Sequence, residues 1–358
     1  MTPKLGAAIR NNLFTAIRRR QLDGSIRPYT NSKKRGIRSR AMVLGLIMTV
    51  SYSLVVTAGD DMRKAEPIDP LPTNVHLAPN VDLGRRLFND SRLSSGNGVS
   101  CATCHISDHS LTDGLPVSRG LPGHPGLVNT PTLFNVGLSA KFNWSGKYLS
   151  LEEQTDKVIE SPRTMGGNWN EIIATLETDT QLAPLFKQLY VDGVTRKNAI
   201  DAIVQFEKSL VTPDAPFDDY LRGNQGAISA DATAGYELFK IYGCASCHQG
   251  VNVGGNMLQV FGIFGTPDAA AMGGDTPGSA EATGITEEKP VFRVPSLRNI
   301  ASTGPYFHDG SEKTLKGAIN TMADYQLGRD LTEGDLGKLE AFLKSLTGKY
   351  QGVPVGEQ

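Results

Sequence analysis

Apolar residues recur at helical spacing in several stretches of the chain. The clearest stretch is 332–346, whose apolar side chains fall on one face of a helix: Leu336, Leu339, Phe342, Leu343 and Leu346. A strong amphipathic run at 196–206 lies within 151–211, which is predicted to be helical, and 230–242 and 81–90 predict two more helices. No stretch alternates apolar and polar residues convincingly, so the expected fold class is mainly α.

Long segments rich in Gly, Pro or Asn separate these stretches. Residues 108–136 and 254–288 predict irregular loops, and the first of these must wrap around something. Residues 59–80 are Pro-rich and predict a linker. The chain is therefore expected to consist of helices joined by long irregular loops.

The first 58 residues predict an export signal. Arg38 and Arg40 precede an uncharged, largely apolar run at 41–58, which is typical of a basic leader followed by a secretory signal peptide. The run is long enough that a single retained N-terminal membrane span is the alternative. In both cases the positive-inside rule puts the rest of the chain outside the cytoplasm, so we expect a periplasmic location.

Charge is distributed unevenly along the chain. Residues 1–40 contain eleven Lys or Arg and one acid, a net charge of +10, and the whole chain carries −1, so residues 41–358 carry −11. An acidic body without a basic stripe argues against nucleic-acid binding and favours a basic protein partner.

All four cysteines lie in Cys-x-x-Cys pairs, and a His follows each pair directly. Two disulfides, a four-cysteine zinc site and covalent c-type haem attachment all use such pairs. The histidines favour haem, because the chain has only 6 His and haem iron needs an axial imidazole at this position. The residues predicted to hold two haems are Cys101, Cys104, Cys244 and Cys247, with His105 and His248 as iron ligands.

A helix precedes each motif, which indicates a weak internal repeat with 143 residues between His105 and His248. We therefore predict two cytochrome c-like haem domains, at 81–225 and 226–358. The second axial position of each iron decides its chemistry: a Met raises the potential for electron transfer, whereas an open position can bind peroxide. The candidate ligands are Met257, Met272, Met322, His109, His124 and His308.

From about Leu83 to Tyr350 the chain resembles the bacterial di-haem cytochrome c peroxidases, whose relatives include the MauG-type protein-oxidising enzymes. The order and spacing of the matching segments carry the resemblance, and no single segment is specific. The segments are 83–88, 129–135, 151–154, 217–223, 250–255, 294–299, 305–310 and 342–348.

The resemblance implies different roles for the two haems. The C-terminal haem, with His248 and Met322 as ligands, would accept electrons, and the N-terminal haem on His105 would react with peroxide. Trp144 stands where the family has a Trp between the haems.

The resemblance also implies one calcium ion at the interface of the haem domains. The matching positions are the side chain of Asn129 and the backbone carbonyl groups of Thr303 and Pro305. Hard oxygen ligands of this kind suit calcium.

Three positions depart from the family pattern. Leu121 stands where a distal His commonly covers the peroxidatic iron at rest, and Thr164 stands where the family has a catalytic Glu. Residues 144–147 read Trp-Ser-Gly-Lys instead of Trp-Asp-Gly-Arg. His124 and Glu160 are the nearby substitutes, although neither has the family's spacing. Because positioned acid–base catalysis contributes ~10²–10⁴ in rate, we expect slow peroxide turnover.

Three functions are consistent with this pattern. The first is a peroxidase that reduces hydrogen peroxide with electrons from a small donor protein, a cytochrome c or a cupredoxin. The second is a MauG-like enzyme that oxidises residues of a dedicated partner protein, and the third is a non-enzymatic di-haem electron carrier. The resemblance suggests a homodimer as the oligomeric state.

The two motifs generate a direct prediction about haem content. Thioether attachment survives denaturation, so the unfolded, acid-washed protein should retain two haems per chain, measured by the pyridine haemochrome spectrum against protein concentration. One haem or none after washing would contradict the assignment of both motifs.

Overall fold

A computed structural model describes residues 66–73, 77–124, 126–265 and 291–357. The predicted leader, part of the predicted linker, the candidate ligand Met272 and most of the predicted loop 254–288 lie outside these residues. Within the described ranges, no helix is both long and apolar enough to cross a membrane.

Helices dominate the described residues, which confirms the mainly α fold class. The α-helices are α1 (Val81–Phe88), α2 (Cys101–Cys104), α3 (Leu151–Glu160), α4 (Trp169–Thr178), α5 (Leu182–Leu189), α6 (Arg196–Ser209), α7 (Pro216–Leu221), α8 (Ala230–Ile241), α10 (Leu315–Thr321) and α11 (Glu333–Lys344). The short turns are η1 (Ser91–Leu93), η2 (Ser95–Asn97), η3 (Ser107–His109), η4 (Val136–Leu138), η5 (Cys244–Ser246), η6 (Ile300–Ser302) and the π-helix η7 (Met322–Leu327).

Two small antiparallel sheets were not predicted from the sequence. One pairs β1 (Leu258–Val260) with β2 (Val291–Arg293), and the other pairs β3 (Lys349–Tyr350) with β4 (Val353–Pro354). Strands of two or three residues are too short to show an alternating pattern.

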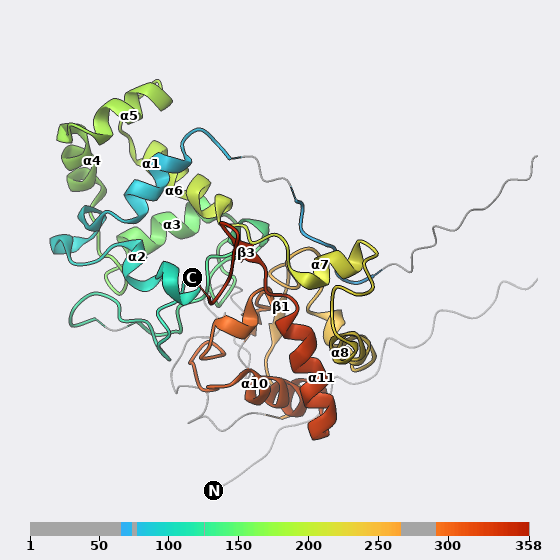
Figure 1. Ribbon diagram of the computed structural model, residues 1–358. Helices are drawn as coiled ribbons and strands as arrows, with labels where there is room; N and C mark the ends of the chain where they lie inside the picture. The colour runs from blue at the N-terminus through green and yellow to red at the C-terminus, as the bar shows by residue number, and fades with distance from the viewer. Residues whose placement is uncertain (1–65, 74–76, 125, 266–290, 358) are drawn as a thin grey trace, which may run out of the picture. The chain divides into compact units, whose positions relative to one another are not determined.

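Two helix pairs cross closely, and each crossing is made at a glycine. A Cβ atom on Gly84 of α1 would lie 1.9 Å from the carbonyl oxygen of Ala202 in α6. A Cβ atom on Gly235 of α8 would lie 1.9 Å from the carbonyl oxygen of Lys338 in α11. Figure 1 shows α8 and α11 lying against each other. Only a residue without a side chain permits backbones to approach this closely.

The crossings bring a phenylalanine onto each motif histidine. Four residues after the glycine, Phe88 lies 6.3 Å from the His105 ring, measured between ring centroids, and Phe239 lies 6.5 Å from the His248 ring. Across each crossing a second phenylalanine packs on the first: Phe206 at 5.1 Å and Phe342 at 5.0 Å.

A buried hydrogen-bond junction joins the segments that follow the two motifs. Asn135 and Asn299 both adopt left-handed backbone conformations with φ of 60°. Their amide nitrogens donate to the same hydroxyl oxygen, that of Thr212, at 2.8 Å and 3.0 Å. Their amide oxygens accept from the backbone nitrogens of Thr212 and Gly348 at 3.0 Å and 2.9 Å. The asparagines and Thr212 are buried, so these polar groups depend on one another.

Within the described ranges, the buried apolar residues form three clusters. One is built from residues between Leu83 and Val204, and a second from Ile68 and residues between Phe217 and Leu346. The third contains Phe88 and Phe206 of the first crossing together with Val355 near the C-terminus. Contacts place 61–358 in one compact unit. The division into haem domains at 81–225 and 226–358 stays a prediction: the first two clusters follow it, whereas the third joins residues of both ranges.

The close crossing of α8 and α11 predicts that Gly235→Ala destabilises the haem-loaded protein. The added methyl group must push the helices apart, and overpacking typically costs ~1–3 kcal/mol in the free energy of unfolding. Thermal unfolding checks this, and a Gly235→Ala protein as stable as the unsubstituted one would contradict the packing.

Gly337→Ala is the matched control for that experiment. Gly337 is exposed on α11, and a Cβ atom built there would meet open space. The substitution should therefore be neutral or stabilising by up to ~1 kcal/mol.

Candidate haem centres

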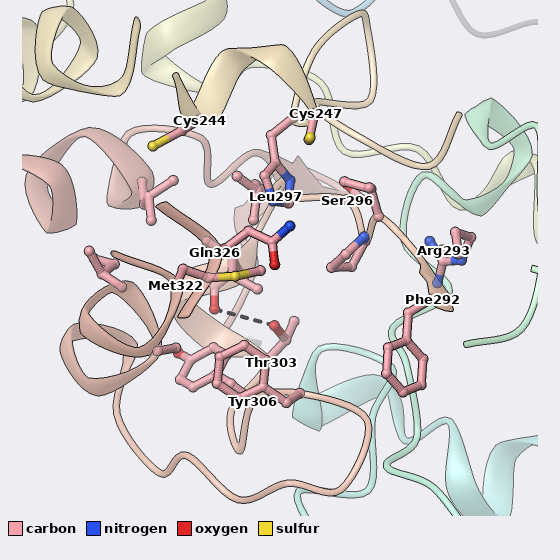
Figure 2. A pocket seen from close by; sticks show the side chains of 18 of the residues that line it. Cys244, Cys247, Phe292, Arg293, Ser296, Leu297, Thr303, Tyr306, Met322 and Gln326 are labelled. Atoms are coloured by element: carbon pink, nitrogen blue, oxygen red, sulfur yellow. Dashed lines mark hydrogen bonds between the residues drawn. The ribbon is translucent and has the colours of Figure 1, made fainter. Parts of the chain in front are cut away.

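A cavity of about 240 Å³ lies beside the second motif. Figure 2 shows Cys244 and Cys247 on one side of the cavity, with Met322 and Tyr306 across from them and Arg293 well away from Cys244. Most of the lining is apolar or aromatic, which suits a large planar hydrophobic group.

His248 lines this cavity as a neutral imidazole. Burial lowers the pKa of its ring to about 4, and the backbone carbonyl groups of Val253 and Pro295 only partly oppose this shift. The Nδ1 atom is buried without a hydrogen bond. A neutral ring is the form that binds iron.

Met322 lines the same cavity from the junction of α10 and η7. Its thioether is therefore available to a group that His248 binds. Met257 does not line the cavity, and His308 lines it in a buried position. Of the candidate ligands, His109 and His124 are exposed.

The four cysteines have free thiols, and neither pair forms a disulfide. Burial raises the pKa of Cys101 to about 12 and that of Cys244 to about 11, so both thiols are protonated at neutral pH. Among the residues that the structure describes, no group of three or more His, Cys, Asp or Glu could hold a metal ion. Free thiols, a neutral imidazole and an apolar cavity fit a covalently attached haem better than a zinc ion.

The first motif forms α2, which Ser100 and Thr103 cap reciprocally. His105 follows it directly, and burial lowers the pKa of its ring. The Nδ1 atom lies 3.0 Å from the carbonyl oxygen of Leu111, to which a protonated Nδ1 donates. This hydrogen bond leaves Nε2 as the nitrogen that can bind iron.

The positions that depart from the family pattern have structural roles in this chain. Leu121 is 8% exposed and belongs to the first apolar cluster, while His124, which pairs with it in a short turn, is exposed. The Thr164 hydroxyl donates to the carbonyl groups of Val158 and Ser161 at 2.5 Å and 3.2 Å.

Glu160 is also engaged elsewhere. Its carboxylate pairs with Lys157 at 3.0 Å and with Arg196 at 2.9 Å, at the end of α3. Because two cations hold its carboxylate, Glu160 is not free to take the place of the missing glutamate.

Trp144 connects the cavity with the segment after the first motif. Its indole nitrogen donates to the carbonyl oxygen of Asn129 at 2.8 Å, and its ring lies 6.4 Å from the His308 ring. The backbone nitrogen of Asn129 donates in turn to the carbonyl oxygen of His308 at 2.7 Å. Asn129, Trp144, Thr303 and Pro305 all line the cavity, so the residues matched to calcium and the matched tryptophan come together.

Two charged residues near the motifs were missed by sequence reasoning. Arg293 is 9% exposed and lines the cavity. Glu207 is 8% exposed, accepts a hydrogen bond from Thr155 at 3.2 Å, and has a pKa that burial raises to about 8. Arg293 could have been noticed in the sequence, because it is the one charged residue in the apolar run Val291–Val294. Glu207 stands at the end of an amphipathic run, where a charged residue is ordinary, so the sequence gave no sign of its burial.

The family model described as "Di-haem cytochrome c peroxidase" matches residues 78–226. Cytochrome c peroxidase Ccp of Escherichia coli (strain K12) is 40% identical over 295 residues, which cover 80% of this chain but only 62% of that protein. Cytochrome c551 peroxidase of Nitrosomonas europaea is 36% identical over 84% of this chain and 90% of its own length. Methylamine utilization protein MauG of Methylorubrum extorquens is 31% identical, covering 72% of each chain.

Solved structures give a consistent result. The crystal structure of a MauG-like protein associated with microbial copper homeostasis matches with a TM-score of 0.67 and 27% identity, covering 81% of this chain and 95% of that one. The diheme peroxidase BthA of Burkholderia thailandensis has a TM-score of 0.61 at 18% identity, covering 78% of this chain and 90% of that one, which shows a common fold. The chain therefore belongs to the di-haem cytochrome c peroxidase family, a family of oxidoreductases that includes MauG.

Proposed function

We propose that this chain is a periplasmic di-haem peroxidase that reduces hydrogen peroxide to water with electrons from a small donor protein. The reaction, H₂O₂ + 2 e⁻ + 2 H⁺ → 2 H₂O, breaks the O–O bond with two electrons from the donor and two protons from solvent. One observation carries the proposal: two thiols, His248 and Met322 line one apolar cavity beside Trp144. Bound haem supplies an iron that carries electrons and, where a coordination position is open, binds peroxide.

The cavity supports the electron-accepting role for the second site. A neutral His248 and the soft thioether of Met322 are the ligand pair that raises a haem potential. The lining around them is mostly apolar or aromatic, which would further favour the less charged, reduced state of the iron. Trp144, on the wall of this cavity, is the residue that we assign to electron transfer toward the His105 site.

We propose that, at the first site, His105 would bind the iron of an attached haem and that neither Leu121 nor Thr164 would add a second ligand. Leu121 cannot bind a metal, and packing in the core holds it in place. The Thr164 hydroxyl is committed to two backbone carbonyl groups, so it does not hold a proton for peroxide. A haem attached there would thus admit peroxide without a reductive step, but position 164 supplies no carboxyl group to move the proton, so we expect slow turnover.

A MauG-like activity on a partner protein is the second candidate. It is favoured by the similarity to a MauG-like protein of known structure and to the MauG of Methylorubrum extorquens. The two candidates differ in what peroxide does: it consumes a reduced donor in the first, and it leaves a covalent change in a partner protein in the second.

Steady-state turnover tests the proposed function. Peroxide should oxidise a reduced small cytochrome in the presence of the haem-loaded protein, slowly but well above the rate without it. Thr164→Glu, which restores a carboxyl group, should raise this rate by ~10-fold or more, below the ~10²–10⁴ of an optimally placed acid.

Thr164→Val is the matched control for that experiment. It removes the same two hydrogen bonds without adding a carboxyl group, so any gain in rate should be absent. No donor oxidation by the haem-loaded protein would refute the peroxidase proposal, and equal rates for the Glu and Val variants would refute the account of Thr164.

Substitution of Met322 tests the ligand assignment. Met322→His replaces a thioether by an imidazole, which should shift the reduction equilibrium of one haem by more than ~10-fold toward the oxidised state and leave the other unchanged. Met257→His, at a methionine outside the cavity lining, should change neither haem. A redox titration of Met322→His that matches the unsubstituted protein would mean that another residue is the ligand.

We also propose that Asn129, Thr303 and Pro305 hold one calcium ion. The Asn129 amide nitrogen donates to the carbonyl oxygen of Leu115 at 2.8 Å. This hydrogen bond does not use the amide oxygen, which stays available as a ligand. The carbonyl oxygens of Thr303 and Pro305 accept no backbone hydrogen bond within the described ranges. Oxygens of this kind, on residues of one cavity lining, suit a hard cation.

Elemental analysis should find about one calcium per chain, and chelation should slow electron transfer between the two haems. Asn129→Ala should lower the calcium content in the same way, because it removes the only side-chain ligand of the proposed site. A protein that contains no calcium and is indifferent to a chelator would remove this assignment.

A further inference from the structure

Arg293 is a buried cation that faces the cavity. It ends β2, where it pairs with Leu258 of β1, and its side chain is 9% exposed. Its Nε atom donates to the carbonyl oxygen of Asn143 at 3.0 Å, and its backbone nitrogen donates to the carbonyl oxygen of Trp144 at 2.8 Å. The first contact fixes the stem of the side chain and the second fixes the backbone, but neither involves the two terminal nitrogens of the guanidinium group.

Those terminal nitrogens have no acceptor among the described residues. No ion pair within the described ranges includes Arg293, and burial alone lowers its pKa to about 10, without an acidic neighbour to oppose the shift. No Asp or Glu lines the cavity, so Arg293 is its one residue with a permanent charge among the described residues. Figure 2 shows Arg293 at the edge of the cavity, away from Cys244.

A second buried arginine shows how the same fold treats a cation that it neutralises itself. Arg298 is 1% exposed, and its two terminal nitrogens donate to the carboxylate of Asp218, each at 3.0 Å. Its remaining donors reach the carbonyl groups of Val251 and Asp69. An unpaired buried charge is strongly destabilising, so the contrast indicates that the anion for Arg293 comes with the group that fills the cavity.

We infer that Arg293 binds a propionate of the haem attached at Cys244 and Cys247 and thereby helps to set the potential of that haem. The guanidinium fork matches a carboxylate in a two-point hydrogen bond, which an ammonium group cannot reproduce. Reduction adds one negative charge to the haem, so a fixed cation beside it favours the reduced form. Arg293 is thus a positioning residue that adds to the effect of Met322.

The contacts of Arg293 give this charge a second consequence. Its backbone and Nε atom hold the Asn143–Trp144 segment, and its neighbour Phe292 packs on His308 with ring centroids 4.4 Å apart. Binding of the propionate would therefore fix Trp144 relative to the haem. This inference rests on the haem assignment of the second motif, but it does not depend on peroxide turnover.

The test is an equilibrium redox titration of the haem-loaded protein, with no peroxide present. Arg293→Gln should lower the reduction equilibrium constant of the Met322 haem by ~10-fold or more, which is ~59 mV for one electron. Arg293→Met, which keeps the apolar volume of the side chain, should give the same shift, so that failure of one variant to fold does not decide the result. Arg293→Lys, which keeps the charge but not the fork, should recover part of the loss.

Arg329→Gln is the matched control. Arg329 is exposed over the ring of Tyr242, near the same motif, so its removal deletes an equal charge in a screened position and should change the equilibrium less than ~2-fold. A change of less than ~2-fold in the reduction equilibrium constant of Arg293→Gln or Arg293→Met would overturn the inference. A change in Arg329→Gln as large as that in Arg293→Gln would also overturn it. The inference can fail in this way while peroxide turnover persists, and it can hold in a protein that turns over no peroxide.

Discussion

The close approach of two helices at a glycine is the constraint on which both haem centres depend. In each half of the protein a glycine lets the helix before the motif press against a later helix, and the phenylalanine four residues on then packs beside the motif histidine. Because Gly84 and Gly235 have no space for a methyl group, the separation of the helices is fixed. The orientation of His105 and His248 follows from that separation.

The halves share this scaffold but differ at several equivalent positions. Bridges between Phe142 and Tyr148 and between Tyr306 and Glu312 lie 164 residues apart in the sequence, as do Asn135 and Asn299. At the same offset, Trp144 corresponds to His308 and Asn129 to Arg293. The repeat places one aromatic or imidazole ring and one polar side chain in each half, and all four of these residues line the same cavity. Differences at these equivalent positions fit the different roles that we propose for the two haem centres.

The sequence predicted those features that depend on the spacing of nearby residues. Each haem motif is contiguous, and the helix expected over 332–346 corresponds to α11 because Thr332 caps its start and Leu336, Leu339 and Phe342 share a face. Contacts between distant segments could not be predicted in this way. The guanidinium group of Arg293 is held by Asn143, 150 residues away, and its burial is a property of the folded cavity.

The departures at Leu121 and Thr164 were visible in the sequence, but their consequences depend on packing and hydrogen bonds. Leu121 lies in an apolar cluster, and the Thr164 hydroxyl is used by the backbone, so neither position is poised for peroxide chemistry. We therefore expect the His105 iron to keep an open or water-filled position even when both haems are oxidised. Electron paramagnetic resonance of the fully oxidised protein tests it most directly. One high-spin and one low-spin signal are expected, and azide should convert the high-spin signal at once. Two low-spin signals before azide is added would contradict an open position at the His105 iron.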